Sequence, residues 1–112
     1  MSPTLTRTLL DPIADTLGLT ETELGRLFGV SRQAIGQWRE RGLPSSRQAK
    51  AATLASICDL LSHSLKPERI PGIARRPAAA YGGLSLLEMI ESDRHEKLHQ
   101  KVRRSFDWAI AA

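Results

Sequence analysis

Three neighbouring polar residues, Arg32, Gln33 and Gln37, have side chains that can recognise the edges of DNA bases. Gln33 and Gln37 are four residues apart, so in a helix they would lie on one face. A glutamine amide donates and accepts hydrogen bonds at once, which fits the major-groove edge of adenine, whereas arginine fits guanine or a phosphate. The pattern predicts that Gln33 and Gln37 read bases and that Arg32 contacts a base or a phosphate. The alternative is that they are only solvated residues of an exposed face.

The segment around them, residues 21–42, has the spacing of two helices joined by a tight turn. Gly25 falls where the two helices would cross, a place with no room for a side chain larger than a methyl group. Gly29 falls where the chain turns and where glycine most easily takes a positive φ. This is the spacing of a helix-turn-helix, which places its second helix in the major groove of DNA. Gly36, on the outer face of that helix, would let it lie close to the DNA.

Local signals support both helices of this segment. Thr20 and Glu23 form a capping box at the start of the first helix, and Ser31 is a natural N-cap for the second. Ile35 and Trp38 fall on the inward side of the second helix, which leaves its polar side for DNA.

Positive charge is concentrated in the same part of the chain. Six basic residues and one acidic residue between residues 26 and 50 give a net charge of +5, whereas residues 1–25 carry −3. Such a cluster would bind phosphates with an affinity that falls as salt is added. Arg39, Arg41 and Arg47 are the predicted phosphate contacts, and the alternative is a solubilising surface.

Length and composition point to a small soluble protein. The chain has 112 residues, a net charge of +4 and 41% hydrophobic residues. No apolar run approaches the length of about 20 residues that a membrane-spanning helix needs, and no secretion signal is recognisable. Cys58 is the single cysteine and cannot form an internal disulfide. We therefore expect a cytoplasmic location and a packing role for Cys58.

The periodicity predicts an all-α fold in two parts that depend on each other or on a partner. Residues 1–65 would form the DNA-binding part and residues 66–112 a second, smaller helical part. Pro67, Pro71 and Pro77 follow the boundary and are expected to break regular structure. We find no strand pattern, internal repeat or low-complexity tract.

An arm and two helices are expected in the first part outside the turn segment. Residues 1–10 have the character of a loosely ordered arm, and Asp11 with Pro12 would begin a short helix that ends at Gly18. Ser45 and Ser46 are predicted to cap a long helix, whose apolar stripe is formed by Leu54, Ile57, Cys58, Leu61 and Leu65.

In the second part, the glycine pair at 82–83 predicts a turn, and Ser85 with Glu88 predicts a capping box for a short helix. Asp93 with Glu96 predicts the same device at the start of a final helix. The apolar side of that helix would be formed by Leu98, Val102, Phe106 and Ala109.

The final helix also has a basic stripe, formed by Lys97, Lys101 and Arg104 at helical spacing and continued by the aromatic Trp108. Tryptophan is frequent at interface hot spots, so this face could bind a partner. The alternative is that the basic residues are solvated and that Trp108 packs onto the core.

At this point two resemblances can be stated. The turn segment resembles an Xre-type helix-turn-helix, on the strength of Gly29, Val30, Ser31, Gln33, Ile35 and Trp38. Residues 76–90 resemble the second domain of Xre/MbcA/ParS-type antitoxins, through Gly82, Gly83, Ser85, Leu87, Glu88 and Ile90. Ala78 stands where that domain commonly has asparagine, and Leu86 stands where it commonly has proline.

The resemblance implies an all-α antitoxin that blocks a RES-type, NAD-consuming toxin with its second part and represses its own operon through the helix-turn-helix. It implies double-stranded operator DNA and a cognate toxin as partners. A homodimer is expected with or without a toxin, because a single helix-turn-helix reads only a short site. The candidate toxin contacts are Arg75, Arg76, Tyr81, Lys101, Arg104, Trp108 and Ala112.

Two other classes of function remain open. A stand-alone dimeric repressor would use the second part only for dimerisation and would need no toxin. An enzyme is not expected, because we recognise no nucleophile, phosphate loop or metal constellation. His95 and His99 have the spacing of two zinc ligands but lack a convincing third, so we expect neither a metal nor a cofactor.

Overall fold

The computed structural model describes residues 3–111, with side chains described for residues 9–105. All regular structure in residues 3–111 is helical, and this confirms the all-α prediction. The α-helices are α1 (Pro3–Leu17), α2 (Glu21–Phe28), α3 (Arg32–Arg41), α4 (Ser45–Ser64), α5 (Ile70–Arg75), α6 (Leu86–Glu91) and α7 (His95–Ala111), and the 3₁₀ helices are η1 (Pro67–Arg69) and η2 (Ala79–Tyr81).

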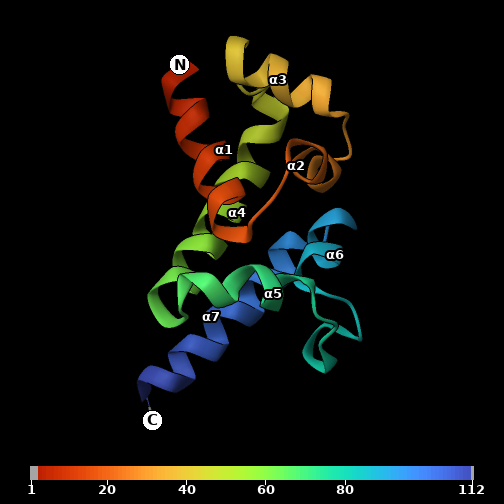
Figure 1. Ribbon diagram of the computed structural model, residues 1–112. Helices are drawn as coiled ribbons and strands as arrows, with labels where there is room; N and C mark the ends of the chain where they lie inside the picture. Colours follow the sequence, from red (N-terminus) through yellow and green to blue (C-terminus); the bar gives the residue numbers. More distant parts are fainter. Residues whose placement is uncertain (1–2, 112) are drawn as a thin grey trace.

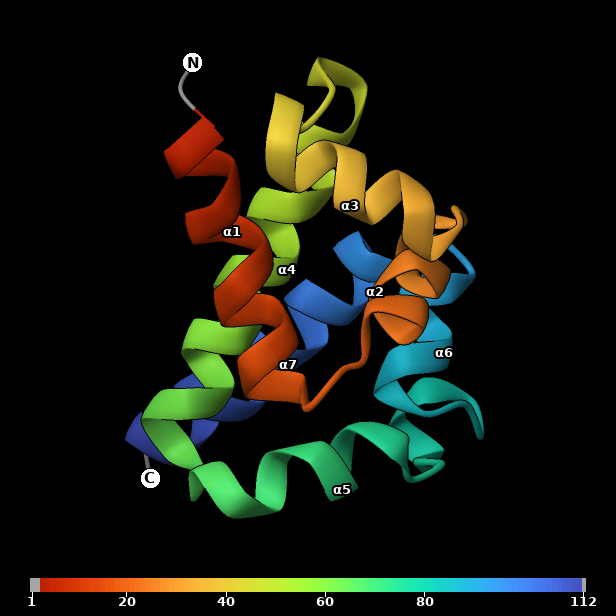
Figure 2. The ribbon, with the colours of Figure 1, turned by 45° about the horizontal axis from the view of Figure 1, so that its top comes forward.

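The long helix α4 is the centre of the arrangement. It packs most extensively against α7 on one side and α1 on the other. The pair α2 and α3 lies toward one end of the molecule, and α5 with the C-terminal part of α7 lies toward the other (Figures 1 and 2). The molecule measures 44 × 26 × 25 Å, so α3 and the end of α7 are far apart.

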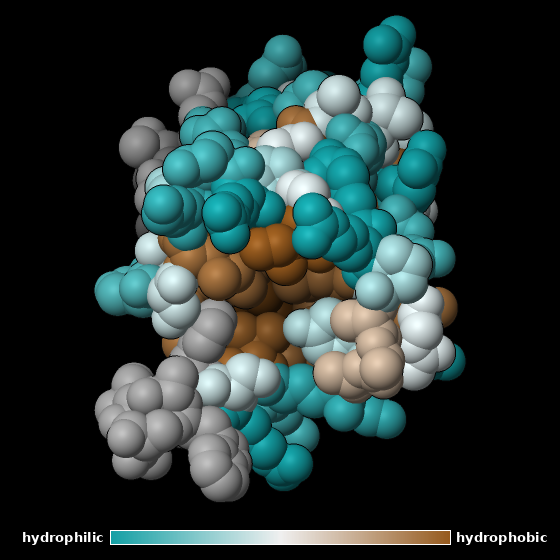
Figure 3. Space-filling model, turned by 60° about the horizontal axis from the view of Figure 1, so that its bottom comes forward, coloured by the Kyte–Doolittle hydropathy of each residue, from teal (hydrophilic) through white to brown (hydrophobic). Residues whose placement is uncertain are grey.

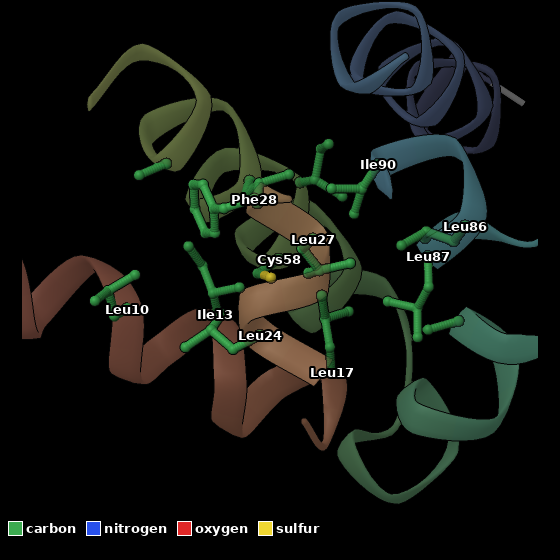
Figure 4. Close-up of a cluster of buried hydrophobic side chains, with 14 of the residues drawn as sticks. Leu10, Ile13, Leu17, Leu24, Leu27, Phe28, Cys58, Leu86, Leu87 and Ile90 are labelled. Carbon is green, nitrogen blue, oxygen red and sulfur yellow. The ribbon is translucent and has the colours of Figure 1, made fainter. Parts of the chain in front are cut away.

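One hydrophobic core runs through both predicted parts. Leu24 and Ile57 of the first part and Leu86 and Ile90 of the second belong to the same cluster of buried side chains, and each is at most 1% exposed. Figure 4 shows side chains of α6 in one cluster with those of α1, α2 and α4, and α2 is the helix of the first part that α6 packs against. The core therefore crosses the boundary at residue 65.

The expected N-terminal arm is helical instead. Helix α1 begins at Pro3, and Pro12 lies inside it rather than at its start. Leu10, Ile13 and Leu17 recur at helical spacing and are fully buried. An interior proline removes one helical hydrogen bond, but burying these three side chains outweighs that loss.

The predicted N-caps of α2, α3 and α6 are present, and each is a serine or a threonine. The predicted capping boxes of α2 and α6 are both present, and Ser31 caps α3 by accepting from the Ala34 N–H over 3.2 Å. Ser45 and Ser46 are not caps: they are the first two residues of α4, and Pro44 precedes them without a side-chain hydrogen bond.

Two further expectations about the second part are wrong. Residues 67–75 are helical rather than irregular, because Pro67 and Pro71 occupy first-turn positions where a missing N–H costs little. Asp93 does not cap α7, which begins at His95; it takes a φ of 60° and bonds to Lys50 instead. The glycine pair at 82–83 does turn the chain, with φ values of 66° and 88°.

Candidate nucleic-acid interface

The turn between α2 and α3 is fixed by two glycines. A Cβ on Gly25 would lie 2.6 Å from the Val30 carbonyl oxygen, so even a methyl group does not fit. The obstacle is the backbone of the turn itself, whose Val30 N–H donates to the Gly25 carbonyl over 2.9 Å. Gly29 has a φ of 68° and ends α2, as its position in the sequence predicts.

Helix α3 is anchored by its inward face. Ile35 is fully buried and Trp38 is 9% exposed. The Trp38 ring meets the Phe28 ring of α2 edge to face, with 5.5 Å between the ring centroids. These contacts fix which side of α3 faces solvent.

The outward face of α3 presents the residues predicted to read bases. Arg32, Gln33 and Gln37 are all exposed. A Cβ on Gly36 would meet no atom within 4 Å, so the helix surface is open at that position. This face combines amide, guanidinium and bare backbone, which are the groups that contact bases and phosphates.

Of the three predicted phosphate contacts, Arg39 forms ion pairs with carboxylates of the same chain. Its guanidinium donates to both carboxylate oxygens of Glu21, at 2.7 and 3.1 Å, and to Asp11. The Glu21 carboxylate, assisted by Asp11, raises the pKa of Arg39. Arg39 therefore ties α3 to α1 and α2, and its charge is already balanced.

Arg47 also has a partner within the chain, whereas Arg41 is exposed. Arg47 donates to the Phe28 carbonyl over 2.9 Å and lies 5.9 Å from the centre of the Trp38 ring. It therefore contacts the inward side of α3 rather than its exposed side.

The structure adds Arg26, which the sequence analysis did not select. Arg26 and Arg32 line a shallow cavity of 350 Å³ beside the turn, together with Ser31 at the start of α3. Two guanidinium groups beside the N-terminus of a helix suit a phosphate. The signal was present in the sequence, because Arg26 directly follows the glycine that packs against the turn.

The candidate toxin contacts are spread over the second part of the chain, on α5, η2 and α7 and in the loop after α5. Arg76 and Arg104 are exposed, while Tyr81 and Lys101 are half-buried. Burial raises the pKa of Tyr81. The side chain of Trp108 and the whole of Ala112 lie outside the described residues.

Arg75 has a different place from the other candidates. It is directed toward the first part, where its guanidinium donates to the carbonyls of Leu17 and Gly18 at 2.9 and 2.8 Å. On the lower face of the molecule, a hollow with apolar surface lies beside polar side chains (Figure 3).

The part of the chain that the structure describes contains no cluster of three or more side chains that could hold a metal ion. Burial raises the pKa of the Cys58 thiol to about 12, so this side chain packs as a small apolar residue. Within the same residues no helix combines the length and the apolar character needed to cross a membrane.

Comparison of the chain with models of protein families, with curated proteins and with solved structures finds no match. The assignment of a function therefore depends on the geometry of α3 and of the second part.

Proposed function

We propose that this protein binds double-stranded DNA in a sequence-specific way and represses transcription from the site that it occupies. The proposal rests on the difference between the two faces of α3, one buried and apolar and the other exposed and polar. Ile35 and Trp38 bury one side of it, and Arg32, Gln33 and Gln37 stand exposed on the other. A tight turn next to such a helix is the arrangement that inserts into a major groove.

In this proposal each exposed group has a distinct role. Gln33 and Gln37 contact adenine edges, and Gly36 between them allows the backbone to approach the bases. Arg32 and Arg26 hold phosphates at the N-terminal end of α3, which sets the register of the helix in the groove. Two copies of the chain would read half-sites about 34 Å apart.

The proposal is tested by selecting bound duplexes from a random-sequence DNA pool and measuring affinity for the enriched site by fluorescence anisotropy. Q33A and Q37A should each lose about tenfold or more in affinity for that site. Both should bind random DNA as the wild type does. Q100A, which removes an exposed glutamine on α7, is the matched control. Failure of the wild type to enrich any sequence contradicts the proposal.

A second candidate function is neutralisation of a toxin by the second part. It is supported by an apolar hollow on the lower face of the molecule (Figure 3) and by two exposed cations of the second part, Arg76 directly after α5 and Arg104 on α7. Apolar surface and exposed cations suit a protein cleft that normally receives an anionic dinucleotide. In this reading the DNA-binding part represses the operon of the toxin pair.

Affinity capture of the tagged protein from its native host tests this candidate. Capture of a stoichiometric enzyme that consumes NAD, and that the protein inhibits, supports it. The double variant R76E/R104E should then lose the enzyme, whereas Q33A should retain it. Recovery of the protein with operator DNA alone supports the stand-alone repressor.

A further inference from the structure

Arg75, at the end of α5, connects the second part to the junction between α1 and α2. Its guanidinium donates to the Leu17 carbonyl over 2.9 Å and to the Gly18 carbonyl over 2.8 Å. Leu17 is the last residue of α1 and Gly18 follows it, so no N–H group of a further helical turn can donate to these carbonyls. Gly18 itself is in close contact with α5, because a Cβ there would lie 3.0 Å from Pro71.

The same guanidinium also reaches α2. It donates to Glu23 Oε2 over 3.1 Å, while Glu23 Oε1 accepts the Thr20 N–H over 3.0 Å. The backbone hydrogen bond from Thr20 is the main cause that lowers the pKa of Glu23, and Arg75 lowers it further. A single carboxylate therefore caps α2 and receives a cation from the second part.

Helix α2, which Arg75 contacts through Glu23, is in turn packed closely against the turn and against α3. Gly25 packs against the turn backbone with no space for a methyl group. Phe28, one turn further along α2, holds the Trp38 ring of α3 edge to face. A chain of hydrogen bonds and packed atoms thus connects Arg75 with the helix proposed to read DNA.

We propose that Arg75 is a positioning residue for DNA recognition: through Glu23 and the end of α1, the second part holds α2 and α3 in the orientation that DNA requires. This inference rests on the proposed DNA-binding function. It gives Arg75 a role inside the protein rather than on a partner surface. A partner on the second part that displaced Arg75 would, by linkage, weaken DNA binding.

Two variants test the positioning role in the full-length chain. R75Q removes the guanidinium, and E23Q removes its carboxylate partner while keeping a side-chain oxygen that can cap α2. Both should weaken binding to the selected duplex by about two- to thirtyfold. The changes in net charge have opposite signs, so a purely long-range electrostatic effect would make E23Q bind more tightly. R76Q matches the charge change of R75Q at an exposed neighbour and should bind as the wild type does.

The salt dependence of binding separates positioning from direct contact. Loss of a phosphate contact reduces the slope of log affinity against log salt by about one, whereas loss of a positioning residue leaves it unchanged. A reduced slope in R75Q overturns the proposal, as does wild-type affinity in both R75Q and E23Q. If R75Q does not fold by circular dichroism, E23Q alone decides.

A second readout does not require DNA. In ¹H–¹⁵N spectra, R75Q and E23Q should shift the amide signals of Gly29 and Gly36, which report on the turn and on α3. R76Q should leave both signals in place. If the wild type binds no DNA, the proposed function fails, and unshifted Gly29 and Gly36 signals would overturn the coupling separately.

Discussion

Lys50 of α4 donates a hydrogen bond to Asp93 in the loop between α6 and α7, with 2.7 Å between Nζ and Oδ1. The surroundings of the two side chains differ, since 10% of the Lys50 side chain is exposed and 78% of that of Asp93. The Lys50 ammonium also lies 5.6 Å from the centre of the Phe28 ring. Because an uncompensated buried charge is costly, Lys50 depends on Asp93 more than Asp93 depends on Lys50.

Removing the Asp93 charge alone should therefore destabilise the fold more than removing both charges. The asparagine that D93N introduces tolerates a positive φ as aspartate does, but it leaves Lys50 without a carboxylate partner. We expect D93N to lower Tm, and K50M/D93N to recover most of the loss, because methionine fills the space of the lysine stem without a charge. E91Q removes an exposed carboxylate on α6 and should melt as the wild type does. Equal Tm values for D93N and wild type would show that the pair does not contribute to stability.

His95, beside this ion pair, should make stability depend on pH. Its Nδ1 is buried without a hydrogen-bond partner among the described residues. Burial, and then the Lys50 charge, lower its pKa below 6.5, while Glu96 and Asp93 oppose this. As pH falls below 6.5 the unfolded state takes up the proton first, so stability is lost toward the lower pKa of the folded state.

Between pH 7 and about pH 5, Tm should therefore fall less in H95Q than in the wild type. H63Q removes an exposed histidine and should keep the wild-type dependence. Parallel curves for H95Q and wild type would contradict the assignment.

The sequence predicts interactions between residues that are close along the chain, and it does not reveal those between distant residues. The cap at Thr20 needs only Glu23, three residues away, and could be predicted from local chemistry. The bond between Lys50 and Asp93 spans 43 residues, and nothing local marks Asp93 as its partner rather than as a helix cap. The contacts of Arg39 with Glu21 and Asp11 span 18 and 28 residues, so the local sequence does not mark them either.

Gly25→Ala should destabilise the fold by about 1–3 kcal/mol, since the added methyl group is forced against the turn backbone. Chemical denaturation measures the free energy of unfolding directly. G72A is a comparison substitution, because a Cβ at Gly72 on α5 meets no atom within 4 Å. Similar stability of G25A and the wild type would mean that the turn can relax and that α3 is held less firmly than the contacts indicate.

Gly36→Ala should separate stability from DNA binding. Alanine in a helix interior is favoured over glycine by about 0.5–1 kcal/mol, and the space around Gly36 is open. The free energy of unfolding should therefore rise. Affinity for the selected duplex should fall, because the methyl group projects from the face that approaches the bases. A variant that is more stable and binds DNA equally well would place the bases away from this position.

Arg39 and Arg32 should respond to the same substitution in opposite ways. Arg39 bridges Glu21 and Asp11, so R39Q removes a contact among three helices and leaves both carboxylates without this cation. We expect R39Q to lower the free energy of unfolding without reducing the salt slope of DNA binding. R32Q, at an exposed position, should leave stability unchanged and reduce the slope by about one if Arg32 holds a phosphate. A reduced slope in R39Q would mean that its guanidinium exchanges Glu21 for a phosphate when DNA binds.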